Sequence, residues 1–142
     1  MPRCRLSLLA ALICLGGCAS GIEPGGNFPS VTFDVTTPYD AAYRRAAEFA
    51  RVCHTAPEHP YGVEYRASET LDDKFAVGRI VVVKVPEPAV HLEVIETKPK
   101  GKTDSTVTVT VLGQGLWDAG ELAAAKQSIQ SATPVCRPAG KG

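Results

Sequence analysis

Two of the three histidines lie close together in the chain and are the residues best suited to bind a metal ion. His54 and His59 flank Pro57 and Glu58, and two imidazoles with a carboxylate in one segment could hold zinc. The spacing differs from the H-x-x-x-H pattern of a helical metal pair, and no third strong ligand is nearby in the sequence. We therefore expect a solvated loop that binds no metal and no cofactor. His91 is assigned to the polar face of a strand.

The other residue patterns that support catalysis are missing from the sequence. A serine nucleophile would need a G-x-S-x-G turn, and Gly113-Gln114-Gly115 contains no nucleophile. The glycine-rich loops that bind phosphate are also missing. Asp72 and Asp73 are adjacent carboxylates, but neighbouring residues on a turn point apart, which favours a solvated hairpin over a general acid and base. The sequence therefore predicts a protein that is not an enzyme.

Charged and aromatic residues offer a few candidate contacts for a partner. The 15 basic and 15 acidic residues balance, so nothing favours binding to nucleic acid. Lys98, Lys100 and Lys102 form a basic hairpin tip that could touch anionic lipid or lipopolysaccharide, although lysines commonly keep such a tip soluble. Trp117, the only tryptophan, could anchor a partner or close one end of the core, and the core is favoured.

Alternating and helical patterns then predict the elements that position these residues. Apolar residues alternate with polar ones in five predicted strands, and they recur at three- and four-residue steps in two predicted helices. The strands are expected at 28–35, 61–67, 75–85, 89–97 and 106–112, and the helices at 38–53 and 118–132. This order, β-α-β-β-β-β-α, predicts an α+β two-layer sandwich, in which an antiparallel sheet of about five strands carries two helices on one face.

These patterns also predict positions for two glutamates, one on the polar face of a strand and one in a helix cap. In the strand at 89–97, His91 and Glu93 alternate with valine and leucine, so we expect both side chains on the polar face. Asp118-Ala119-Gly120-Glu121 has the form of a capping box, in which Glu121 reaches back to the first residue of the second helix.

The first residues look like a secretion signal. Arg3 and Arg5 precede the apolar stretch Leu6 to Leu15, which is too short for the roughly 20 residues of a membrane-spanning helix. Leu15-Gly16-Gly17-Cys18 resembles the lipobox of bacterial lipoproteins. This resemblance implies cleavage after Gly17, acylation of Cys18, and a lipid anchor that holds firmly because two or three acyl chains are buried. Ala19 follows the cysteine where such families use aspartate for inner-membrane retention, which indicates the periplasmic face of the outer membrane.

The cysteines that remain after this processing predict a disulfide. Cys4 and Cys14 would leave with the signal, and Cys18 would be acylated. Cys53 and Cys136 are then the two that remain, and two thiols in an oxidising compartment are typical of a disulfide. A redox-active pair is the competing interpretation, but the sequence has no C-x-x-C and the two residues are far apart.

The expected organisation is a signal peptide at 1–17, an acylated cysteine with a flexible tether at 18–27, one domain at 28–137, and a disordered tail at 138–142. The predicted fold is similar to the helix-grip domains of outer-membrane assembly lipoproteins (the C component of the β-barrel insertion machinery) and to small uncharacterised lipoprotein families. This likeness is architectural, and no function follows from it. We expect an accessory or assembly factor that binds an envelope protein. The alternative is a carrier or sensor of an apolar ligand, such as a lipid, held between sheet and helices.

Overall fold

The computed structural model describes residues 21–138. Over these residues the chain forms the predicted order of elements, with five strands and two α-helices. The strands are β1 (Ser30–Val35), β2 (Tyr65–Asp72), β3 (Val77–Lys84), β4 (Glu87–Lys100) and β5 (Asp104–Val111), and the helices are α1 (Tyr39–Ala50) and α2 (Ala119–Ser131). The predicted signal peptide, the acylation site at Cys18 and all but the first residue of the predicted tail lie outside the described residues.

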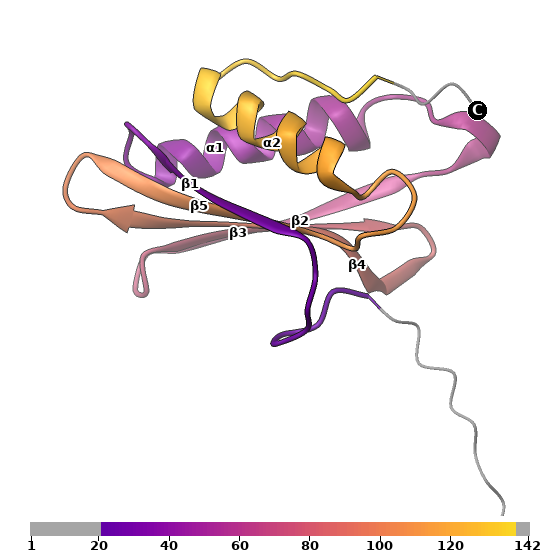
Figure 1. The fold of residues 1–142 in the computed structure, drawn as a ribbon, viewed down its shortest axis with the longest axis horizontal. Helices are drawn as coiled ribbons and strands as arrows, with labels where there is room; N and C mark the ends of the chain where they lie inside the picture. Colours follow the sequence, from indigo (N-terminus) through magenta and orange to yellow (C-terminus); the bar gives the residue numbers. More distant parts are fainter. Residues whose placement is uncertain (1–20, 139–142) are drawn as a thin grey trace, which may run out of the picture.

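The strands form one antiparallel sheet in the order β1-β5-β4-β3-β2. Both helices lie on the same face of this sheet (Figure 1). The predicted α+β two-layer sandwich is therefore confirmed. No helix within residues 21–138 is both long enough and apolar enough to cross a membrane.

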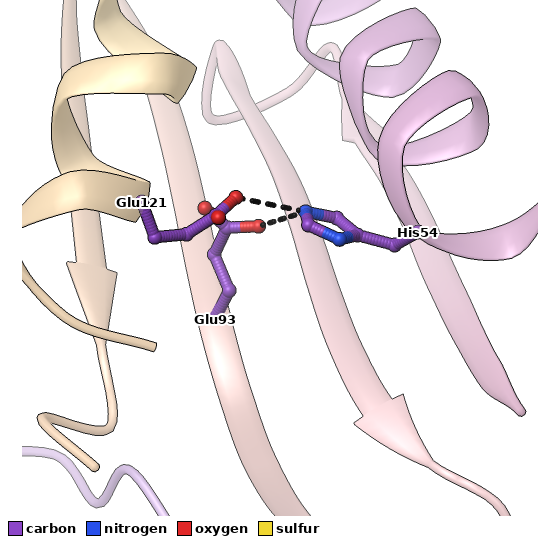
Figure 2. A group of neighbouring side chains, drawn as sticks. All are labelled: His54, Glu93 and Glu121. Atoms are coloured by element: carbon purple, nitrogen blue, oxygen red, sulfur yellow. Dashed lines mark ion pairs between the residues drawn. The ribbon is translucent and has the colours of Figure 1, made fainter. Parts of the chain in front are cut away.

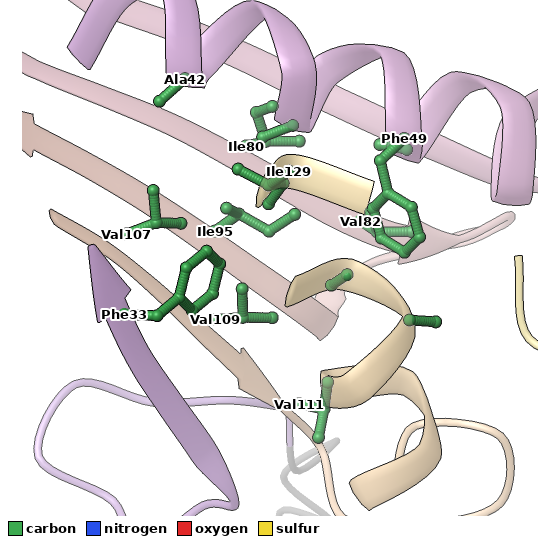
Figure 3. Packing of buried hydrophobic residues seen from close by; sticks show 14 of the residues in the cluster. Phe33, Ala42, Phe49, Ile80, Val82, Ile95, Val107, Val109, Val111 and Ile129 are labelled. Atoms are coloured by element: carbon green, nitrogen blue, oxygen red, sulfur yellow. The ribbon is translucent and has the colours of Figure 1, made fainter. Parts of the chain in front are cut away.

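The core lies between the helices and the inner face of the sheet (Figure 3). Strand β5 alternates strictly between buried and half-buried residues, as expected when one face of a strand packs on a core. Helix α1 contributes the fully buried alanines Ala42, Ala46 and Ala50 on one stripe. Because alanine has so small a side chain, this stripe lets α1 lie close to the sheet.

Helix α1 packs closely on β3 at Gly78. A Cβ atom at this position would lie 2.5 Å from Oγ1 of Thr97 and 2.7 Å from Cδ2 of Tyr43. Such contacts force a well-packed interior to shift. We therefore expect Gly78→Ala to lower the free energy of unfolding by about 1 to 3 kcal/mol, measured by urea denaturation. An unchanged midpoint of urea unfolding would show that α1 can move away from β3 without loss of stability.

Strand β4 differs from the predicted strand in length and in phase. It runs to Lys100, so Lys98 and Lys100 belong to the strand, and the turn covers residues 101–103. Val82 pairs with Glu93 while Val83 pairs with His91, which leaves one extra residue, Leu92, in β4. This bulge reverses the alternation, because one inserted residue moves the following side chains to the opposite face.

The prediction that His91 and Glu93 share the polar face is therefore wrong for Glu93. Its pairing partner, Val82, is fully buried on the inner face, and Glu93 is also fully buried. The extra residue at the bulge is the physical reason, since a regular strand would place His91 and Glu93 on one side.

Part of the predicted tether packs against the sheet. Ile22 N–H donates a hydrogen bond of 3.0 Å to the carbonyl oxygen of His91 in β4. Gly21 is buried, and a Cβ there would lie 2.5 Å from the backbone nitrogen of His91. Gly21 and Ile22, at least, therefore lie against the domain.

Candidate functional site

His54 enters the interior from the end of α1. The helical path continues beyond Ala50 through one π-helical turn, Arg51–Thr55, in which Ala56 N–H donates to the carbonyl oxygen of Arg51 at 2.9 Å. His54 follows Ala50 by four residues, so it projects from the same buried face. This residue is 6% exposed, and its ring packs edge-on against Phe49, with ring centroids 5.3 Å apart. The prediction of a solvated loop is wrong for this residue, because the helix extends one turn further.

Two buried glutamates meet His54. Glu93 comes from β4 just after the bulge, and Glu121 comes from the first turn of α2. Nε2 of His54 lies 3.0 Å from Oε1 of Glu121 and 3.3 Å from Oε2 of Glu93 (Figure 2). We call His54, Glu93 and Glu121 the buried triad. It joins α1, α2 and the central strand of the sheet.

Burial and neighbouring charges shift the pKa values of His54 and Glu93. Burial alone would lower the pKa of His54, but the carboxylates of Glu121 and Glu93 outweigh burial and raise it to about 9. Burial raises the pKa of Glu93, His54 opposes this, and the Glu121 carboxylate adds to it. The triad therefore holds an imidazolium facing two carboxyl groups at neutral pH.

The polar atoms of the triad approach each other without hydrogen-bond geometry. Within residues 21–138, Nε2 of His54, both carboxylate oxygens of Glu93 and Oε1 of Glu121 are buried and have no hydrogen-bond partner. The two contacts of Nε2 are therefore ion pairs only, and a ring nitrogen carries at most one N–H for two carboxylates. Buried polar groups in folded proteins are almost always hydrogen-bonded, so this group calls for a functional explanation.

A pocket of about 500 Å³ opens beside the triad, at the end of the sandwich where α1 ends and α2 begins. We call it the end pocket. Its lining includes His54 and Glu121 together with the rings of Trp117 and Tyr65, whose centroids are 5.3 Å apart. The remaining lining residues are Cys53, Pro57, Glu58, His59, Pro60, Tyr61, Val63, Leu116, Cys136, Arg137 and Pro138.

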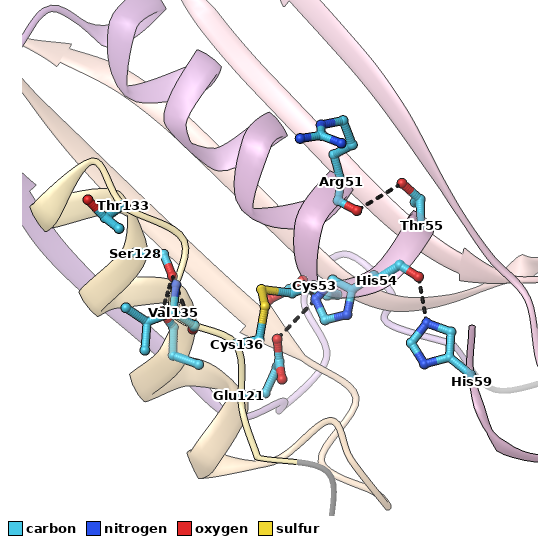
Figure 4. The surroundings of a disulfide bond; sticks show 12 residues. Arg51, Cys53, His54, Thr55, His59, Glu121, Ser128, Thr133, Val135 and Cys136 are labelled. Atoms are coloured by element: carbon cyan, nitrogen blue, oxygen red, sulfur yellow. Dashed lines mark hydrogen bonds and ion pairs between the residues drawn. A yellow bond between two sulfur atoms is a disulfide. The ribbon is translucent and has the colours of Figure 1, made fainter. Parts of the chain in front are cut away.

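The predicted disulfide between Cys53 and Cys136 is present and forms part of the pocket wall (Figure 4). The C-terminal segment reaches Cys53 because it runs back along α2. Val135 N–H donates to Oγ of Ser128 at 2.8 Å, and that hydroxyl donates to the carbonyl oxygen of Ala124 at 2.8 Å. The disulfide thus joins the C-terminal segment to the turn that follows α1, next to His54.

An ion pair next to the disulfide secures the same segment. The guanidinium of Arg137 donates two hydrogen bonds to the carboxylate of Asp118, at 2.6 and 3.1 Å. This carboxylate also accepts a bond of 2.8 Å from Gly120 N–H and so caps α2. The predicted cap at Asp118 is confirmed, but Glu121 does not reach back to it. Glu121 is buried instead, because α2 directs it toward His54.

Of the other residues that the sequence singled out, His59 and Trp117 also line the end pocket, whereas the lysines do not. His59 donates from Nε2 to the backbone oxygen of His54 at 2.6 Å, so the two imidazoles do not converge on one point. Trp117 is buried, with 7% of its surface exposed, which supports its core role over an exposed anchor. Lys100 forms an ion pair with Asp34 on β1. Lys98 and Lys102 remain exposed candidates for a contact with a partner.

The sequence held one signal for His54 and none for its partners. Ala46, Ala50 and His54 follow each other at four-residue steps, so the stripe of α1 could have been extended to His54. Glu93 depends on a bulge, and Glu121 matched a pattern that explained it as a capping residue. Only the packing of three distant elements brings these side chains together.

The fold and the site define an α+β two-layer domain with an end pocket above a buried His–Glu–Glu group. No protein-family model matches this chain, and no curated protein matches it. Among solved structures, the chain is similar to a point mutant of norcoclaurine synthase from Thalictrum flavum in complex with a transition-state analogue. That match has a TM-score of 0.41 and 12% sequence identity, and it covers 75% of this chain and 92% of the other.

Proposed function

We propose that this protein is a non-enzymatic lipoprotein of the cell envelope that binds a small, largely apolar ligand in its end pocket. The observation that carries this proposal is the pocket of about 500 Å³ with Trp117 and Tyr65 in its walls. Pockets of roughly 300 to 1,000 Å³ with apolar walls and a few polar groups are typical of sites for small molecules. The aromatic walls suit an apolar or aromatic body, and Glu121 and His54 provide polar contacts.

The entrance of the pocket supports the same proposal. Tyr61 is fully exposed and has a positive φ of 62°, a backbone conformation that costs energy in a residue other than glycine. Leu116 on the rim is 47% exposed. Large apolar side chains around an opening are typical of a surface that an apolar ligand covers.

The ligand would bind at a different place from the one expected from the sequence. The interface between sheet and helices is occupied by the core cluster, including Phe49, Ile80 and Ile129. The end pocket lies beside this core, where the disulfide and the segment 57–65 surround it. We propose that the acylated Cys18 anchors this binding domain at the periplasmic face of the outer membrane.

A second candidate function is the binding of an envelope protein as an accessory or assembly factor. The outer edge of β2 pairs with no other strand within residues 21–138. Leu71 at the end of this strand and Phe75 in the following turn are 39% and 69% exposed. A partner could add a strand at such an edge and cover these side chains.

The ligand proposal is tested by titrating the purified, chelator-treated protein with N-phenyl-1-naphthylamine, a small aromatic amine that fluoresces in apolar surroundings. We expect saturable binding at one site, and a change in the emission of Trp117, the only tryptophan. Replacing Leu116 with glutamate should weaken binding about tenfold or more, because a charge would have to be desolvated at the rim.

The matched control is Phe75→Glu, which places the same charge on an exposed apolar residue outside the end pocket. This variant should bind the probe as the unchanged protein does. Equal loss in both variants, or binding that does not saturate, would contradict a ligand site in the end pocket.

A further inference from the structure

The buried triad brings three potential ligand atoms close together. Nε2 of His54 and one carboxylate oxygen each from Glu93 and Glu121 all lie within 4.8 Å of one another. Glu93 is fully buried, and both of its oxygens lack a hydrogen-bond partner among the described residues. An imidazole nitrogen and carboxylate oxygens are ligands that divalent transition-metal ions accept.

We propose that the buried triad is a binding site for a divalent transition-metal ion of the zinc type. With ligand bonds of about 2.0 to 2.2 Å, two ligand atoms on one metal are about 2.9 Å apart at a right angle and about 3.4 Å apart at the tetrahedral angle. The separations of Nε2 from the oxygens of Glu121 and Glu93, 3.0 and 3.3 Å, fall in this range. The same atoms are buried and lack hydrogen-bond geometry, so the ion pairs leave polar atoms that a bound cation would satisfy.

The charge of the ligand set also suits a divalent ion. Carboxylates in a water-poor interior need positive partners. A divalent cation bound by neutral His54 and two carboxylates gives a neutral site. The ring nitrogen must release its proton to the solvent when it becomes a ligand.

The position of the triad leaves the ion accessible from one side. His54 and Glu121 line the end pocket, whereas Glu93 is buried behind them. Three protein ligands leave a position for water or for a group of a bound molecule, as in metal sites that act on ligands. The metal site does not require that the pocket bind an apolar molecule, so the two proposals can fail separately.

Isothermal titration of the purified, chelator-treated protein with Zn²⁺ tests this inference. We expect one ion per chain. Glu121→Gln keeps the size of the side chain but removes a charged ligand, and it should weaken Zn²⁺ binding at least about tenfold. Glu69→Gln, the same change on an exposed residue of β2, should bind as the unchanged protein does. Binding that Glu121→Gln leaves intact, or no binding by the unchanged protein, would overturn the proposal.

A spectroscopic readout distinguishes the site from adventitious binding at the surface. Co²⁺ in place of Zn²⁺ should give visible absorption bands of a four- or five-coordinate ion, which Zn²⁺ displaces and Glu93→Gln abolishes. Circular dichroism of Glu93→Gln confirms that the variant is folded. The weak spectrum of six-coordinate, hydrated Co²⁺ would contradict a triad site. The naphthylamine titration uses metal-free protein. Its failure would therefore contradict the proposed ligand pocket but not the proposed metal site.

Discussion

Replacing both Cys53 and Cys136 with alanine should lower the free energy of unfolding by about 4 to 5 kcal/mol. The disulfide closes a loop with a sequence separation of 83, and the entropy that it removes from the unfolded chain corresponds to this magnitude. This is a large part of the total stability of a small domain. Urea denaturation followed by the fluorescence of Trp117 measures the change.

The double replacement avoids an unpaired thiol, and reduction of the unchanged protein serves as its control. Both should move the unfolding midpoint by a similar amount. The variant should also bind the naphthylamine probe more weakly, because Cys53 and Cys136 form part of the pocket wall. An unfolding midpoint that stays in place would show that the helices and the tail are held without the disulfide.

Replacing His54 with leucine should cost about 3 to 5 kcal/mol of unfolding free energy in buffer with a metal chelator. The variant leaves the carboxylates of Glu93 and Glu121 buried without a positive partner, and removal of one member of a buried ion pair has an effect of this size. Chemical denaturation of the metal-free protein measures it.

Two comparisons identify the uncompensated charge as the cause. His91→Leu makes the same change on a half-buried residue outside the triad, and it should shift stability by no more than about 0.5 kcal/mol. Replacing His54, Glu93 and Glu121 together with leucine should recover most of the loss, because no charge then remains buried. A triple variant less stable than His54→Leu would show that shape, and not charge, dominates the site.

The architecture could be predicted because it depends on local patterns. The alternation in residues 106–112 predicted β5 closely, since the period of a half-buried strand shows directly in the sequence. The alanine stripe of α1 likewise reported a helix that packs on a sheet. The structure confirms the predicted pairing of Cys53 with Cys136. This pairing could be predicted because only these two cysteines remained once the first three were assigned to the signal and the anchor.

The candidate site could not be predicted in the same way because its members were assigned one by one. Glu93 obeyed the alternation of its strand until the bulge at Leu92 turned it inward. Glu121 fitted a capping pattern, and the order of residues gave no sign of its contact with His54. A bulge depends on how two strands pair, so it cannot be predicted from the periodicity of one strand.

The sequence by itself determined the order of strands and helices and the layers, because periodicity shows within short segments. It also determined the disulfide, because the other cysteines could be eliminated as partners. Only the tertiary structure decided that His54, Glu93 and Glu121 share one buried point beneath a pocket. The physical reason is that these residues come from three elements far apart in the chain. Their charges become significant only when packing excludes water from all three together.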